Sequence, residues 1–301
     1  MPSKENSKNK TGGRPRTAIE VAPEGALAAT IPHGSESPAY AYAPLAPGSL
    51  VPGVAEANVR NQDAVVEAIR KVLGELEPKS RALTLVLPDT AVRVFVLDFD
   101  TLPQKPVEAI PVLRFRLRKM VPFDVEHAAL SYQVLVQGEG NVKVLATVMP
   151  GPVLAEYEAA VRAAGYESGA VLPSSLASLA ALDSPEPILA ANLSGQALTT
   201  SITSGQDLHL FRTVDLPEDA DARAAEIQRS IAVAAAYYED KLAGRPRRLH
   251  YAGIAKAEDF ARVLADPDLS VVDMVPSTGL GATTALGPLS IAGISGALAG
   301  A

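Results

Sequence analysis

The stretch from which the fold can be predicted, residues 81–135, reads RALTLVLPDTAVRVFVLDFDTLPQKPVEAIPVLRFRLRKMVPFDVEHAALSYQVL. Two runs rich in β-branched and aromatic residues lie on either side of residues 89–91, which predicts a hairpin or a tight pair of strands. Between residues 104 and 120, apolar residues then recur at intervals of three or four, as on one face of a helix. The proline in VPFD (121–124) ends that helix, and a further strand is predicted through 132–135.

Both ends of this stretch continue into an alternating α/β pattern. Upstream, two strands are predicted within residues 17–32, turning at 23–25, and a helix at 62–76, with residues 33–61 mostly loop. Downstream, strands are predicted at 141–148, 169–172, 188–194, 197–203, 208–216, 248–253 and 270–275, and helices at 150–164, 174–182, 219–243 and 256–265. Ser174 or Ser175 is the expected N-cap of its helix. The order of strands and helices recurs after residue 184, which predicts two similar α/β domains facing each other.

The composition limits the chemistry that the chain can perform. A net charge of −7, from 27 basic and 34 acidic residues among 301, disfavours nucleic acid as the main ligand. The absence of cysteine excludes thiol catalysis, disulfides and Cys-ligated metals, and the four histidines lack metal-ligand spacing. We therefore expect no metal site and no catalytic residues. No run reaches the ~20 apolar residues of a spanning helix, and the apolar residues 286–301 are expected to form a buried terminal helix.

Several short motifs resemble those of PilM-type pilus assembly proteins in their order and spacing. They extend over roughly residues 17–275, and their combination carries more information than any one of them. The motifs are LP at 87–88, VPF at 121–123, YQVL at 132–135, RAAGY at 162–166, EIQRS at 226–230 and YY at 237–238.

The resemblance implies a two-domain actin-like (ribonuclease H-like) α/β fold, related to that of FtsA, with a small α+β subdomain inserted in the first domain. The expected boundaries are a disordered tail at 1–16, the first domain at 17–102, the insertion at 103–169, a return to the first domain at 170–184 and the second domain at 185–301.

The resemblance also implies a function. Such a protein is expected to be a cytoplasmic scaffold of type IV pilus assembly, peripheral to the inner membrane. Its expected partner is the short cytoplasmic tail of a PilN-like membrane protein, through which it couples indirectly to the pilus motor ATPases. A homo-oligomer is compatible with this role, and an adaptor of a type II secretion or division system is an alternative.

The positions that would hold nucleotide in an actin-like ATPase are altered in this sequence. The first phosphate hairpin contains Glu20, Glu24 and Gly25 around Pro23, which has no amide to donate to phosphate. In the second hairpin, which contains Ser194 and Gly195, Asn192 stands where the family has a metal-organising aspartate, and a glycine pair is reduced to Gly253. The expected protein is therefore a pseudo-ATPase without a cofactor, and a nucleotide-binding ATPase with ATP and Mg²⁺ is the alternative.

The partner-binding surface is expected around the helix at 104–120 and the elements that follow it. The candidate residues are Arg114, Arg118, Val121, Phe123 and Tyr132. Together with Arg116 and Lys119, the two arginines form a basic cluster that fits either an acidic partner segment or lipid headgroups. The alternative is a solvated helix face, since long cationic side chains commonly cover apolar surface.

Overall fold

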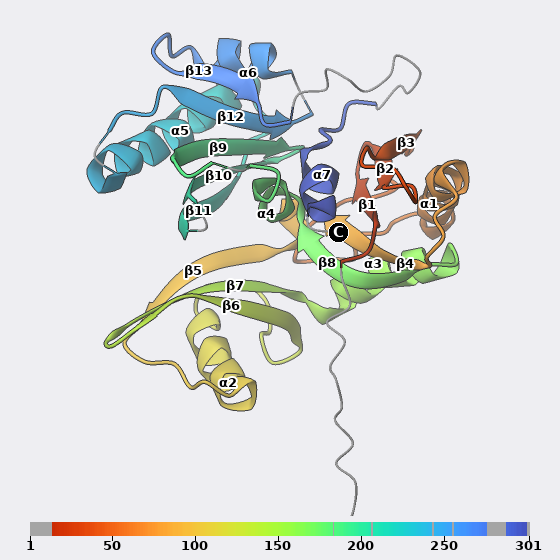
Figure 1. Cartoon of the computed structure of the whole chain (residues 1–301), viewed down its shortest axis with the longest axis horizontal. Coiled ribbons are helices and arrows are strands. Elements are labelled where there is room, and N and C mark those ends of the chain that lie inside the picture. The colour runs from red at the N-terminus through yellow and green to blue at the C-terminus, as the bar shows by residue number, and fades with distance from the viewer. Residues whose placement is uncertain are drawn as a thin grey trace, which may run out of the picture.

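The computed structural model describes residues 14–182, 184–205, 207–242, 244–254, 256–275 and 287–299. Within these residues the named strands form two five-stranded sheets and one three-stranded sheet. Figure 1 shows the two larger sheets in separate lobes, with the small sheet and its helix below them. This arrangement confirms the predicted two-domain α/β architecture with a small inserted unit.

The first sheet has the strand order β3-β2-β1-β4-β8. Its strands are β1 (Thr17–Ala22), β2 (Gly25–Thr30), β3 (Ala39–Pro44), β4 (Ala82–Leu87) and β8 (Glu167–Pro173). The predicted turn at residues 23–25 is confirmed, because β1 and β2 pair as an antiparallel hairpin. Residues 33–61 are mostly loop, as predicted, but they also contain β3, whose AYAYAP segment buries Ala41 and Ala43 while pairing with β2.

Helices cover both faces of the first sheet. They are α1 (Gln62–Leu76), α3 (Gly151–Ala163) and α4 (Ser174–Leu179), together with the C-terminal α7 (Ala292–Leu298). Helix α1 has the predicted bounds, and the Asn61 side chain caps it by accepting from the Ala64 amide at 3.1 Å. The predicted serine cap of α4 was wrong, because Pro173 occupies the N-cap and makes no side-chain bond there.

The three-stranded sheet forms the small unit, with strand order β5-β7-β6. Its elements are β5 (Arg93–Phe99), α2 (Pro106–Leu117), β6 (Ala128–Gly138) and β7 (Asn141–Pro150). The predicted pairing across residues 89–91 was wrong. Strand β4 lies parallel to β1 and β8, whereas β5 pairs with β7. Because β4 is buried on both faces, it suits the interior of a parallel sheet better than a hairpin.

The two faces of the small sheet have different neighbours. Helix α2 packs Leu113 and Leu117 against one face, which contains Val144 and Ala146. On the opposite face, Leu145 clusters with Phe211 of the second domain. The small unit is therefore held between its own helix and the second domain.

The second large sheet repeats the topology of the first, with the order β11-β10-β9-β12-β13. Its elements are β9 (Pro187–Ser194), β10 (Ala197–Ser204), β11 (Asp207–Asp215), α5 (Ala220–Leu242), β12 (Arg248–Gly253), α6 (Ala257–Leu264) and β13 (Ser270–Asp273). The predicted turns between its first three strands contain Gly195 and Gly205, which have φ of 51° and 57°. A positive φ favours glycine, which explains both residues.

The sheets do not coincide with the expected boundaries of the insertion at 103–169 and of the second domain at 185–301. The small sheet begins with β5 at Arg93 and ends with β7 at Pro150, while α3 buries Tyr157 and Val161 in the core of the first domain. Helix α7 packs Ile294 against the first sheet, although it follows the second domain in sequence. The expected buried C-terminal helix is thus confirmed over these residues, but it belongs to the first domain.

Two features complete the fold. Most of the expected disordered tail, residues 1–13, lies outside the described residues. Arg14 donates to the carbonyl of Ala299, and Arg16 donates to that of Ile31. Within the described parts of the chain, no helix is both long enough and apolar enough to cross a membrane.

Candidate functional site

A cavity of about 320 Å³ lies between the two large domains. Segments from both domains line it: the β1–β2 hairpin, the loop at residues 50–52, the β9–β10 turn, the end of β12 and the start of α7. The sequence-predicted residues that line it are Glu20, Glu24, Asn192, Ser194, Gly195 and Gly253. The structure therefore brings both hairpins to one cleft, as the resemblance implied.

The tips of the two hairpins face each other across the cleft. A Cβ atom built on Gly195 would lie 4.0 Å from Glu24 Oε1. Arg223, on α5, donates to the carbonyl of Gly195 and so holds the β9–β10 turn. Gly25 does not line the cavity. Its missing side chain makes room for β3, since a Cβ there would lie 2.4 Å from the carbonyl oxygen of Ala43.

Glu20 is the buried acid of the cleft. It is 7% exposed, and its Oε2 has no hydrogen-bond partner among the described residues. The pKa of Glu20 is raised to about 7, mainly by burial. A hydrogen bond from Ser174 lowers the pKa, whereas the charges of Asp89 and Glu24 raise it. Helix α7 approaches closely at Gly293, where a Cβ would lie 2.6 Å from Glu20 Oε2.

The charge of the cleft is unfavourable for a nucleoside triphosphate. Among the described residues that line it, Glu20 and Glu24 are the charged ones, and no lysine, arginine or histidine is present. Pro23 at the hairpin tip has no amide with which to cradle phosphate. In the described part of the chain, no group of three or more His, Cys, Asp or Glu is placed to hold a metal ion. The described lining is therefore acidic and offers no cation to a phosphate group.

Asp89 connects the two domains beside the cleft, and sequence reasoning treated it only as a turn residue. Its carboxylate accepts bonds from the Ser175 amide at 3.0 Å and the Ser175 hydroxyl, and from Thr199 Oγ1 of the second domain at 3.0 Å. Burial raises the pKa of Asp89, although these bonds oppose the rise. Thr199 is the last residue of the second phosphate motif, and its place in that motif was the one feature of the sequence that pointed to the Asp89–Thr199 hydrogen bond.

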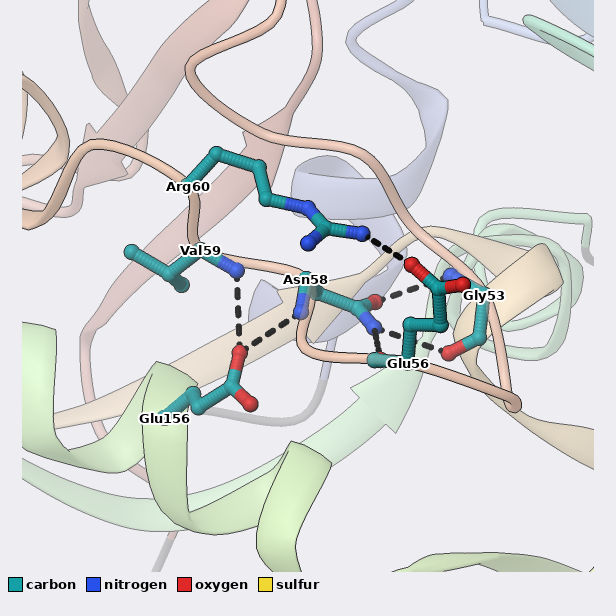
Figure 2. Close-up of polar contacts among 6 residues, drawn as sticks. All are labelled: Gly53, Glu56, Asn58, Val59, Arg60 and Glu156. Atoms are coloured by element: carbon teal, nitrogen blue, oxygen red, sulfur yellow. Dashed lines mark hydrogen bonds and ion pairs between the residues drawn. The ribbon is translucent and has the colours of Figure 1, made fainter.

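The loop that forms one wall of the cleft is held by a polar network that Figure 2 shows. The buried Asn58 side chain accepts from the Gly53 amide and donates to the carbonyls of Gly53 and Glu56, each at 2.9 Å. From α3, Glu156 Oε2 accepts the amides of Asn58 and Val59 at 2.7 and 2.9 Å. This network fixes the loop that carries Leu50, Val51 and Pro52 into the cleft.

The predicted partner-binding residues gather in the small unit, where most of them make contacts within the chain. Arg114 donates to the carbonyl of Ala128 at 3.2 Å, and Arg118 pairs with Glu126 at 2.5 Å. Val121, Phe123 and Tyr132 are partly buried against the core of the small unit. These contacts tie the residues to the small unit, while the Arg118 side chain remains 61% exposed.

A second, more apolar groove lies between the first domain and the small unit, with a volume of about 150 Å³. It is bordered by β6 and β8, which are each the outermost strand of their sheet. Its lining is Leu87, Val92, Ala129, Leu130, Ser131, Thr147, Val148, Met149, Leu154, Val171 and Pro173. Sequence reasoning identified β6 but missed this groove, because the groove depends on how the two sheets are placed.

Comparison with solved structures supports the fold. A chain of a "PilM-PilN type IV pilus biogenesis complex" superposes with a TM-score of 0.73 at 18% identity, covering 94% of this chain and 98% of that one. The cytoplasmic domain of EpsL, an inner-membrane component of the type II secretion system of Vibrio cholerae, gives a TM-score of 0.50 at 14% identity, covering 79% and 81%. A Bacteroides thetaiotaomicron protein with an actin-like ATPase fold gives 0.48 at 10% identity, covering 85% and 90%.

No family model and no curated protein sequence matches the chain. The structural superposition thus confirms the fold that the sequence motifs indicated. At 18% identity, it shows similarity of fold alone.

Proposed function

We propose that this chain is a non-catalytic scaffold of a type IV pilus or related secretion assembly, and that it binds the cytoplasmic tail of a PilN-like inner-membrane protein. The observation that carries the proposal is the superposition on a chain of a PilM–PilN complex over 94% of the present chain. The likeness to a type II secretion component points to the same class of assembly. Through its partner, the chain would lie at the cytoplasmic face of the inner membrane and couple to the pilus motor ATPases.

The apolar groove beside β6 and β8 is the proposed binding site for the tail. Half-buried side chains such as Leu130, Leu154 and Val171 line it and would be covered by apolar side chains of an extended peptide. The outer edges of β6 and β8 offer backbone groups to such a peptide, as in other strand-addition complexes. The network around Arg114 and Arg118 would act indirectly, by holding the small unit in place.

The proposed lack of catalysis rests on the interdomain cleft. Two carboxylates of the β1–β2 hairpin line it without a compensating cation, so a bound triphosphate would meet like charge at that hairpin. The alternative, a nucleotide-binding ATPase, is favoured by the facing arrangement of these same hairpins. A thermal unfolding scan with millimolar ATP and Mg²⁺ separates the two, because a ligand that binds the folded state raises the melting temperature. We expect no rise, and a clear rise would support the alternative.

A pull-down tests the partner assignment. The cytoplasmic tails of candidate pilus and type II secretion membrane proteins from the same genome would be immobilised separately. Retention by a PilN-like tail supports a pilus role, whereas selective retention by a secretion tail would move the assignment to the secretion system. Retention by neither tail would contradict the scaffold proposal.

A further inference from the structure

Helix α2 has an apolar face on each side. On its inner side, Ala109, Leu113 and Leu117 are fully buried against the small sheet. On its outer side, Val107 is 75% exposed and Phe115 is 72% exposed. Figure 1 shows α2 at the outside of the small unit, below the sheet that it covers.

The exposure of large apolar side chains is concentrated on this helix and the turn after it. Nine such residues are exposed in the described chain, and four of them lie within 107–120: Val107, Val112, Phe115 and Met120. Isolated exposed apolar residues are ordinary, whereas a contiguous group on one element marks an interaction surface. The outer face of α2 is therefore an unpartnered apolar surface.

The charge around this face has the opposite sign to the charge of the whole chain. Residues 104–127 contain five basic and three acidic side chains, in a chain whose net charge is −7. Lys105 pairs with Glu108, and Arg118 pairs with Glu126. Arg116 and Lys119 are exposed, and their side chains form no ion pair or hydrogen bond with any residue that the structure describes, so their charges are available to a ligand.

We propose that the outer face of α2 docks on an anionic lipid surface, with Phe115 and Val107 entering the boundary of the acyl chains and Arg116 and Lys119 contacting the headgroups. Exposed apolar side chains can enter the acyl boundary while neighbouring cations contact the headgroups, and each cation near an anionic leaflet adds to the attraction. A second copy of the chain fits less well, because a two-fold contact through this face would bring the same cations together. The surface is distinct from the tail-binding groove, so it would provide a second attachment to the membrane.

Vesicle co-sedimentation of the full chain, without any partner, tests this inference separately from the proposed function. We expect binding to vesicles that contain phosphatidylglycerol, weak binding to phosphatidylcholine alone, and release by salt through screening. Phe115→Ser should weaken the partition coefficient about tenfold, because a phenylalanine would no longer be buried. Arg116→Glu should weaken it at least about fivefold at low salt.

Val233→Ser is the matched control, since Val233 is 47% exposed on α5 and lies outside the small unit. It should bind as the wild type does. All variants keep the basic side chains that lie between positions 4 and 16, so any contribution of that segment to vesicle binding cancels in the comparison. Failure of the wild type to bind anionic vesicles, or equal binding by Phe115→Ser, would overturn the proposal. A wild-type dimer that Phe115→Ser converts to a monomer in light scattering would assign the face to a second copy instead.

Discussion

Replacing Glu156 with alanine should loosen the wall of the interdomain cleft. Glu156 Oε2 accepts two backbone amides, those of Asn58 and Val59, and so ties α3 to the loop that lines the cavity. Figure 2 shows both bonds reaching the same carboxylate oxygen. Because the replacement removes one acceptor and leaves two donors without a partner, its effect should exceed that of an ordinary surface mutation.

The magnitude can be worked from these two bonds. A hydrogen bond to a charged group contributes about 1.5–3 kcal/mol, and the partial exposure of Glu156 lets water replace some of this. We therefore expect the free energy of unfolding to fall by about 2–4 kcal/mol. At roughly 2 °C per kcal/mol for a unit of this size, the melting temperature should fall by about 4–8 °C.

Glu158→Ala is the matched control, because Glu158 lies one half-turn further along α3 and its side chain has no hydrogen bond or ion pair with any described residue. Urea denaturation followed by circular dichroism would compare both variants with the wild type, and the control should change stability by less than about 0.5 kcal/mol. If Glu156→Ala and Glu158→Ala were equally stable, the network would not hold the loop and the reasoning would be refuted.

Three further predictions concern the cleft and the C-terminal helix. Asp89→Asn should destabilise the contact between the domains by roughly 1–3 kcal/mol, because an amide nitrogen would face the donors Ser175 and Thr199. Calorimetry would show this loss, and an unchanged unfolding profile would exclude a role for Asp89 in joining the domains. The pKa of Glu20 is raised from 4.5 to about 7, so the folded state keeps the carboxyl proton to a higher pH than the unfolded state does. The free energy of unfolding of the wild type should therefore fall between pH 4.5 and 7, by roughly 3 kcal/mol relative to that of Glu20→Gln. Parallel pH dependences of the two proteins would contradict this. Gly296→Ala should lower the free energy of unfolding by about 1–3 kcal/mol, because the added Cβ would meet the carbonyl of Ala177. Gly74→Ala has open space in α1 and should raise it by about 0.5–1 kcal/mol. Denaturant midpoints that move in the same direction for both variants would count against the packing argument.

Local signals in the sequence predicted most of the elements. Helix α1 has the predicted bounds because a periodic apolar face and an asparagine cap both lie within the segment itself. The turns at Gly195 and Gly205 were equally local, since each needs a residue that tolerates positive φ. The strand at 39–44 escaped prediction because its small alanines give little hydrophobic signal among prolines and glycines.

Non-local contacts could not be predicted in the same way. The pairing of β4 with β8 and of β5 with β7 depends on partners that are distant in sequence, so the apparent hairpin was wrong. The Asp89–Thr199 bond joins residues 110 positions apart. The convergence of Glu20 and Asn192 at one cleft was expected from the family resemblance, whereas the unpartnered oxygen of Glu20 and the approach of Gly293 required the three-dimensional structure.

The affinity of a PilN-like tail peptide for the groove tests the central claim most directly. Ser131 is exposed and lines the groove, so Ser131→Trp should fill the groove without removing any core packing. Gln133→Trp is the matched control, because Gln133 is also exposed on β6 but lies outside the groove lining. Isothermal titration should show binding to the wild type and to Gln133→Trp, with affinity at least about tenfold weaker for Ser131→Trp. Equal affinity in all three, or no binding to the wild type, would contradict a scaffold that holds its partner in this groove.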